Sequence, residues 1–136
     1  MRYLGIDPGA KRTGLAVGDD VTKQAGPVGV VEASDPGELL RGIREAIEEH
    51  GPDAIVVGVP YNMDGTEGPE AKKAQALATL LQGATGLRVH LFDERLTSFE
   101  ADELMKGLYT RKQKKARRDA LAAAAILRDF LNRLQP

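Results

Sequence analysis

The spacing of apolar residues changes near residue 35, and this change constrains the fold more than any other feature of the sequence. Before it, short apolar segments follow one another with short Gly- and Pro-containing links, which is typical of an antiparallel meander of strands. After it, segments with helical spacing alternate with short apolar ones, which is typical of parallel strands joined by right-handed crossovers. The predicted strands are residues 2–7, 14–18, 27–32, 54–59 and 88–92. The pattern therefore predicts an α/β fold with a five-stranded mixed sheet, made of a three-strand antiparallel meander and two parallel strands, with helices on both faces.

Capping signals set the expected limits of the helices. Asp35 is a good N-cap residue, Pro36 suits the first helical position, and Gly51-Pro52 ends the apolar stripe that follows. The predicted helices run from Pro36 to His50, from Gly68-Pro69 onward, from a capping box at 97–100 to about Leu108, and from about Lys114 onward.

The length and composition exclude several classes of protein. A chain of 136 residues, 42% hydrophobic and 29% charged, suits a single globular domain spanning residues 1–136. It contains no Cys, which excludes disulfides and thiolate metal sites and is compatible with a cytoplasmic location. No apolar stretch approaches the roughly 18 residues that cross a bilayer, and the N-terminal residues do not resemble a signal peptide, so we expect no membrane partner.

The basic residues are unevenly distributed. The net charge is only −1, yet residues 106–118 contain seven of the 19 Lys and Arg residues and no Asp or Glu. These residues are Lys106, Arg111, Lys112, Lys114, Lys115, Arg117 and Arg118. Such a run is often a solvated link between helices, but on a nearly neutral protein it also indicates contact with a polyanion such as nucleic acid.

Carboxylates stand at the ends of two strands that should be parallel. Asp7 ends the first predicted strand before Pro8-Gly9, and Asp93 and Glu94 end the fifth. Ligands of open α/β sheets bind at the carboxyl ends of the strands, where these side chains should meet. Asp93 and Glu94 point to opposite faces, and strand spacing alone leaves open which of them faces Asp7. The alternative is that Asp7 forms a turn and that Asp93 or Glu94 pairs with Arg95 or caps the next helix.

Asp119 is the third acidic candidate because it continues the apolar stripe of the last predicted helix. That stripe consists of Asp119, Ala123, Ile126, Phe130 and Leu134. A carboxylate aimed at the core is costly unless it is paired or binds a metal, and neighbouring arginines or the helix dipole are the alternative partners. Three such carboxylates at one sheet edge would suit Mg²⁺ or Mn²⁺. Two such ions roughly 3.5–4 Å apart can activate water for attack on a phosphodiester.

Two loops could contact a phosphate backbone at the same edge. Residues 8–14 are bounded by glycines and carry Lys11 and Arg12 directly after Asp7. Residues 58–68 contain Asn62, which could bond phosphate or sugar but equally well forms an Asx turn. Each signal is weak alone, because ordinary hairpin loops have the same composition.

With these residues identified, the chain resembles the YqgF family, bacterial proteins described as pre-16S rRNA nucleases or Holliday junction resolvases. The motifs that carry the resemblance are LGIDPGAKRTGLAV (4–17), IVVGVPYNMDGTEGPEA (55–71), FDERLTSFEA (92–101) and RKQKKARRDALAAAAIL (111–127). The resemblance implies an RNase H-like fold and a role in trimming the 5′ end of precursor 16S rRNA. It also implies that Asp7, Glu94 and Asp119 are the catalytic, metal-binding acids, which is the reason for preferring Glu94 to Asp93.

The sequence departs from the related resolvases in two places. The resemblance implies that those enzymes have an acid after the fourth strand and two acids one helical turn apart on the last helix. Here residues 59–62 contain no acid, and Ala122 stands three residues after Asp119. We therefore expect an RNA-processing nuclease, with Lys11, Arg12, Arg95 and the basic run positioning the strand. A DNA junction resolvase, an ATP-binding domain of the actin and sugar-kinase type and a non-catalytic nucleic-acid-binding factor remain alternatives. The protein would act as a monomer or a homodimer, the latter favoured by junction cleavage.

Overall fold

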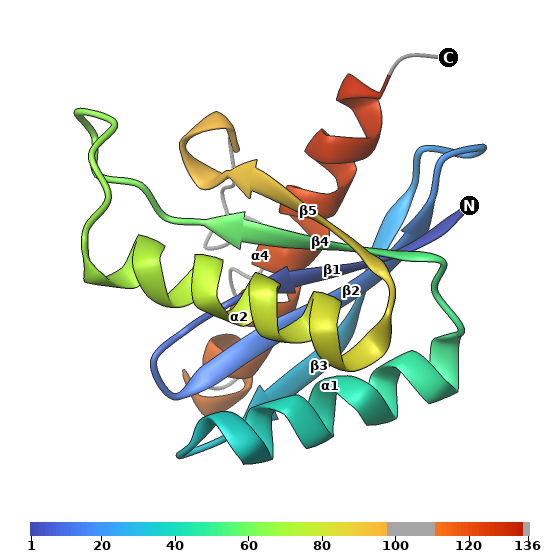
Figure 1. The fold of residues 1–136 in the computed structure, drawn as a ribbon. Helices are drawn as coiled ribbons and strands as arrows, with labels where there is room; N and C mark the ends of the chain where they lie inside the picture. The colour runs from blue at the N-terminus through green and yellow to red at the C-terminus, as the bar shows by residue number, and fades with distance from the viewer. Residues whose placement is uncertain (98–110, 135–136) are drawn as a thin grey trace.

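A computed structural model describes residues 1–97 and 111–134 of the chain, without the side chains of residues 111–117. Five strands form one sheet in the order β3-β2-β1-β4-β5, and helices cover both of its faces (Figure 1). The strands are β1 (Arg2–Asp7), β2 (Arg12–Asp19), β3 (Ala25–Glu32), β4 (Ala54–Val59) and β5 (Arg88–Asp93). The helices are α1 (Pro36–His50), α2 (Pro69–Thr85) and α4 (Arg111–Arg133), with a 3₁₀ turn, η1 (Glu94–Leu96), after β5.

The pairing of the strands confirms the predicted mixed sheet. β1 and β2, and β2 and β3, pair in antiparallel fashion, whereas β4 is parallel to both β1 and β5. The carboxyl ends of β1, β4 and β5 therefore lie at one edge of the sheet, as the site prediction requires.

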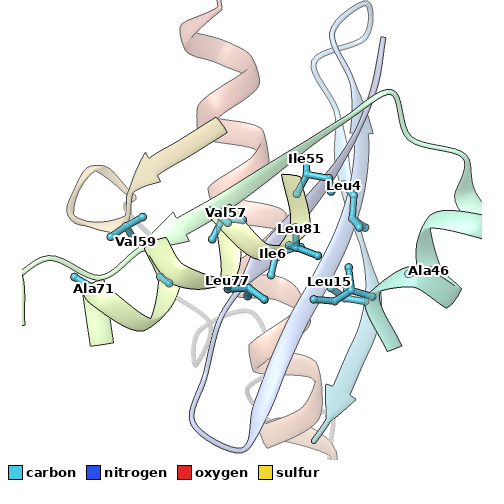
Figure 2. Packing of buried hydrophobic residues seen from close by; sticks show 13 residues of the cluster. Leu4, Ile6, Leu15, Ala46, Ile55, Val57, Val59, Ala71, Leu77 and Leu81 are labelled. Carbon is cyan, nitrogen blue, oxygen red and sulfur yellow. The ribbon is translucent and has the colours of Figure 1, made fainter. Parts of the chain in front are cut away.

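Alternating side chains on the strands separate two cores. Leu4, Ile6 and Val57 lie on the face covered by α1 and α2, where they pack with Ile43 and Leu81 (Figure 2). Of the helices that the structure describes, α4 covers the opposite face. There the core contains Tyr3, Ala16, Val56, Phe92, Ala123, Ile126, Leu127 and Leu131. Side chains on this face of the strands therefore pack against α4.

The capping prediction for α1 is confirmed. The Asp35 side chain accepts a hydrogen bond from the Glu38 backbone N–H at 2.9 Å, and Gly51 ends the helix with a positive φ of 58°. Both features satisfy backbone groups that a helix end leaves without partners.

Several predicted boundaries were too short. β2 extends from Arg12 to Asp19 because antiparallel pairing with β1 and β3 continues through its polar ends. α4 includes Arg111, three residues before the predicted start at Lys114, since Lys and Arg are good helix formers and extend a helix beyond its buried stripe. The predicted helix from 97 to about 108 lies, apart from Thr97, outside the described residues. No helix in the described part of the chain combines the length and apolar character needed to span a bilayer.

Candidate functional site

Asp7 is placed on the α4 face by the geometry of β1. It is the last residue of the strand and shares the orientation of Tyr3, which packs against α4. The pKa of Asp7 is raised, first because burial disfavours its charged form and also because the negative charge of Asp119 lies nearby. A hydrogen bond with Glu94 opposes this shift. Asp7 is thus a mostly buried carboxyl group with two acidic neighbours.

Glu94 is the residue that meets Asp7. It directly follows β5 and continues the face of Phe92, which belongs to the α4-side core. Burial, the hydrogen bond with Asp7 and the charges of Asp7 and Asp93 raise the pKa of Glu94 to about 9. The two carboxyl groups therefore share a proton at neutral pH. The Oε1 atom of Glu94 is buried and accepts no hydrogen bond, so one oxygen of the pair is available to a further partner.

Gly58 makes room for the Glu94 side chain. A Cβ atom on Gly58 would lie 2.8 Å from Oε1 of Glu94 and 2.7 Å from Cδ1 of Ile126 in α4. Real Cβ contacts essentially never fall below 3.0 Å, so any larger residue would displace the carboxyl group of Glu94 or the side chain of Ile126. The end of β4 thus serves the site by having no side chain.

Asp119 reaches the same edge from α4. Its Oδ2 atom accepts a hydrogen bond from Nε of Arg12 at 2.9 Å, and the two side chains are 28% and 32% exposed. Gly14 of β2, the register partner of Asp7, lies against the backbone carbonyl of Asp119, where a Cβ would clash. This close approach brings the turn of α4 that contains Asp119 to the end of β1.

The three predicted carboxylates therefore converge, but they do not form a finished metal cluster. Among the described residues, no group of three or more His, Cys, Asp or Glu side chains is arranged so that it could hold a metal ion. The shared proton of Asp7 and Glu94, and the guanidinium of Arg12 at Asp119, balance the negative charge instead. The donor set still fits a hard divalent cation, because it consists of oxygen atoms and includes the partnerless Oε1 of Glu94.

Asp93 has a different role from its neighbour. Its carboxylate accepts hydrogen bonds from the Arg95 guanidinium at 2.7–3.1 Å and from the Arg95 backbone N–H at 2.9 Å. These bonds lower the pKa of Asp93, so this carboxylate stays ionised. Asp93 thus pairs with Arg95 and caps η1, while Glu94 faces Asp7, which answers the question that strand spacing left open.

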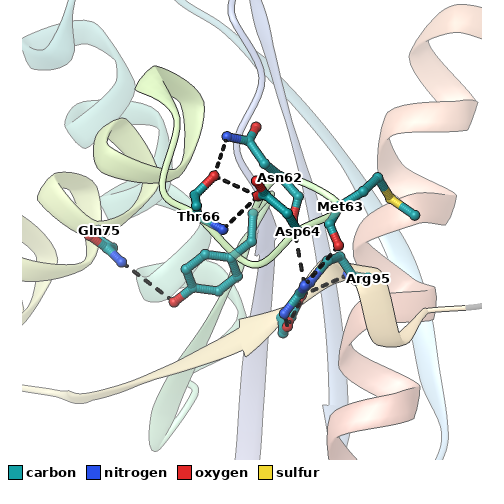
Figure 3. Close-up of polar contacts among 8 residues, drawn as sticks. Asn62, Met63, Asp64, Thr66, Gln75 and Arg95 are labelled. Atoms are coloured by element: carbon teal, nitrogen blue, oxygen red, sulfur yellow. Dashed lines mark hydrogen bonds and ion pairs between the residues drawn. The ribbon is translucent and has the colours of Figure 1, made fainter.

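Arg95 connects this turn to the loop after β4 (Figure 3). Its Nη1 atom donates to the carbonyl oxygens of Asn62 and Met63 at 3.5 and 3.4 Å, and its guanidinium lies 5.7 Å from the ring centre of Tyr61. Asn62 donates from Nδ2 to Oγ1 of Thr66 at 2.9 Å. Asn62 and Arg95, both predicted to contact substrate, are therefore engaged in holding the loop in this state.

Comparison with known proteins places the chain in a family. Residues 1–133 match the model of the RuvX family, which is described as "Holliday junction resolvase". The chain belongs to the RuvX family. This confirms the resemblance to YqgF, the same family under another name.

Curated relatives of this RuvX family member carry another description. A protein of Anaeromyxobacter sp. (strain K) is 45% identical over 138 residues, covering all of both chains. One from Geobacillus sp. (strain WCH70) is 40% identical over 99% of this chain and all of the relative. Both are named "Putative pre-16S rRNA nuclease".

Solved structures show the fold of the RuvX chain. Thermus thermophilus RuvC, in complex with a Holliday junction substrate, aligns with a TM-score of 0.59 at 18% identity, over 97% of this chain and 94% of RuvC. The fowlpox virus Holliday junction resolvase aligns with a TM-score of 0.59 at 11% identity, over 98% of this chain and all of the resolvase. At these identities the likeness concerns the fold alone, and it confirms the predicted RNase H-like architecture.

The remaining predicted contact residues of the RuvX chain are only partly described. Lys11 is exposed on the β1–β2 loop, and Arg118 is exposed on α4 directly before Asp119. Lys106 lies outside the described residues. The other members of the basic run belong to the first turns of α4, but their side chains are not described: Arg111, Lys112, Lys114, Lys115 and Arg117.

The sequence analysis missed Gly14 and Gly58 as parts of the site. Both are isolated glycines in predicted strands, a pattern that marks close approach of another backbone or group. The signal was present, but it did not say which element approaches.

Proposed function

We propose that this chain is a divalent-metal-dependent nuclease that hydrolyses phosphodiester bonds of precursor 16S rRNA during maturation of its 5′ end. The observation that carries the proposal is the buried carboxyl pair of Asp7 and Glu94 at the sheet edge, within electrostatic reach of Asp119. Two buried acids of like charge destabilise each other. Such a pair is therefore not explained by ordinary ion pairing at the surface and indicates a functional site.

Asp7, Glu94 and Asp119 would hold Mg²⁺ or Mn²⁺. A cation at this edge compensates the charge that burial makes costly, and it replaces the proton now shared by Asp7 and Glu94. When bound, such an ion supplies Lewis-acid activation of a phosphate oxygen and of water. The carboxylates orient the ion, and the packing of α4 against the sheet keeps them in place.

The cationic side chains around the pair would hold the nucleic acid. Arg12 lies directly beside Asp119, and Lys11 is exposed one residue earlier on the same loop. The basic run at the start of α4 precedes Asp119 in the chain, so a phosphate backbone entering the site would meet it. Affinity for RNA should therefore fall steeply as salt is added.

The choice of precursor rRNA follows from the relatives. Full-length relatives at 40–45% identity are named for this substrate, and the similarity includes both ends of the chain. We place the activity in the cytoplasm, where ribosomal RNA of bacteria is transcribed and processed.

Cleavage of a 5′-extended 16S rRNA fragment in Mg²⁺ or Mn²⁺ tests the proposal. Asp7→Asn and Glu94→Gln should each lower the cleavage rate by at least about a hundredfold, because each removes a ligand charge without changing side-chain size. Asp53→Asn is the matched control, since its carboxylate accepts from the Arg2 backbone N–H, at the start of β1 rather than its end. If the folded Asp7→Asn variant cleaves as fast as wild type, the assignment of the site is wrong.

A junction resolvase is the second candidate, because the matching family model is described by that activity. The sequence favours it less, since residues 59–62 contain no acid and Ala122 occupies the position of a second helix acid. A four-way DNA junction offered beside the RNA fragment distinguishes the two. Resolution of the junction by a homodimer, with no RNA cleavage, would favour the resolvase, and binding of either substrate without cleavage would favour a non-catalytic factor.

A further inference from the structure

A cavity of about 410 Å³ lies beside the carboxyl site, on the other face of the sheet. It is enclosed by the β1–β2 loop, by the connection between β3 and α1, and by α2. Its lining begins at Pro8, the residue after Asp7. A strand that passes over Asp7 would therefore reach the mouth of this cavity within the length of the loop 8–11.

The walls of the cavity are aliphatic. Leu39 of α1 and Leu77 and Leu80 of α2 line it, and Leu80 is 41% exposed although it is a large apolar residue. Ligand sites are typically cavities of this size with mostly apolar walls and a small number of polar groups. The exposed part of Leu80 gives a flat ligand an apolar surface to contact.

One polar side chain in the cavity wall is available to a ligand. Thr13 lines the cavity and is only 2% exposed, and its hydroxyl forms no hydrogen bond with any described residue. Its oxygen is not one of the buried atoms that lack a partner among the described residues, so the hydroxyl reaches the cavity surface. A hydroxyl both donates and accepts, so it can pair with the edge of a heterocyclic base.

Two lysines and two acids line the cavity, and one of the lysines lies on the side of the carboxyl site. Lys11 lines the cavity, is exposed, and its ammonium group has no partner among the described residues. Lys73 lies on the α2 side and makes only a long ion pair with Glu70, at 3.9 Å. The two acids of the lining are engaged, Asp35 at the Glu38 backbone N–H and Glu70 at Lys73, so Lys11 is the charge available to a phosphate. An apolar pocket with one hydroxyl and this lysine matches a nucleotide, with its base inside and its phosphate at Lys11.

We infer that this cavity is a nucleobase subsite that takes one unpaired base of the substrate strand, close to the phosphate presented to Asp7. The inference rests on the proposed function, because it assumes that the carboxyl site acts on nucleic acid. Recognition of RNA by sequence generally uses such splayed, single-stranded bases. The subsite would select for an unpaired nucleotide at a fixed distance from the cleaved bond.

Binding of single-stranded RNA without metal tests the subsite. Fluorescence anisotropy is measured in chelator with a set of oligonucleotides in which one abasic position is moved along the strand. Wild type should lose about tenfold in affinity at one position and little elsewhere. Ala76→Phe fills the cavity from an exposed position of α2 and should remove that dependence, whereas Gln82→Phe, exposed on the same helix but outside the lining, should keep it.

Thr13→Val adds a test of base reading, because it removes the hydroxyl at constant shape. The preference among four bases at the sensitive position should fall severalfold, with affinity for the abasic strand unchanged. Equal affinity of wild type for all abasic strands, no binding of single strands, or an undiminished penalty in Ala76→Phe would overturn the subsite. Cleavage of precursor RNA by wild type is assayed separately, so a protein that shows the abasic penalty but never cleaves contradicts the proposed function and leaves the subsite standing.

Discussion

The shared proton of Asp7 and Glu94 predicts an unusual dependence of stability on pH. Glu94 has its pKa raised from 4.5 to about 9 in the folded chain. Between these values the folded protein binds one more proton than the unfolded chain, so its stability is full below about pH 4.5 and falls as the pH rises toward 9. A salt-bridged carboxylate has the opposite effect, because its contribution to stability increases as the pH rises.

The magnitude follows from linkage. One pKa unit corresponds to about 1.4 kcal/mol, so a group protonated only in the folded state loses up to roughly 2.7 kcal/mol of stability between pH 6 and pH 8. Glu94 keeps partial contact with solvent, which reduces this to about 1–2 kcal/mol. Gln at this position is neutral in both states and can still donate to Asp7. Between pH 6 and pH 8, Glu94→Gln should therefore gain that amount of stability relative to wild type, or roughly 3–10 °C in Tm.

The free energy of unfolding of wild type and of Glu94→Gln is measured with urea, in chelator, at pH 6, 7 and 8. The two slopes of this free energy against pH are then compared, and the contributions of all other titrating groups cancel in the difference. Glu48→Gln, an exposed change on α1, is the control and should keep the wild-type slope. Adding Mg²⁺ to wild type should reverse the trend, since metal binds the deprotonated carboxylates. If Glu94→Gln retains the wild-type slope in chelator, Glu94 is not protonated and the account of the pair is wrong.

Three further predictions concern the surroundings of the pair. Gly58→Ala places a Cβ 2.8 Å from Oε1 of Glu94 and should lower the free energy of urea unfolding by about 1–3 kcal/mol. It should also lower the cleavage activity. Gly26→Ala is the control: a Cβ there has no atom within 4 Å, so the change should be nearly neutral. Arg12→Gln removes a partly exposed ion pair and should cost about 1 kcal/mol or less in stability. It should also reduce the slope of log affinity for single-stranded RNA against log salt concentration by about 0.7. An unchanged slope would exclude contact between Arg12 and phosphate. Arg95→Ala releases the loop after β4 and should raise KM more than it lowers kcat, with faster proteolysis within residues 60–68; a loop that stays equally resistant would show that Arg95 does not hold it.

The sequence predicted the sheet well because its two halves use different apolar spacing. The meander and the crossovers were both confirmed, and the carboxyl ends of β1 and β5 meet as parallel pairing with β4 requires. The orientation of Glu94 could not be predicted in this way. β5 has core contacts on both faces, through Val89 and Phe92, so alternation does not reveal which side holds the site. Only the family resemblance separated Glu94 from Asp93.

The position of α4 depends on glycines of the sheet as well as on the acids of the site. Gly5, Gly14 and Gly58 lie on three adjacent strands, and a Cβ on each would collide with Leu127, with the Asp119 carbonyl or with Ile126 and Glu94, respectively. Small residues on α4, such as Ala123, complete the close contact. The helix can bring Asp119 to the end of β1 only because these strands present backbone instead of side chains. Three acids in the sequence are therefore insufficient evidence for a site of this kind: glycines that let the last helix approach the sheet are an equal requirement, and a related chain that kept the acids but lost these glycines should not assemble it.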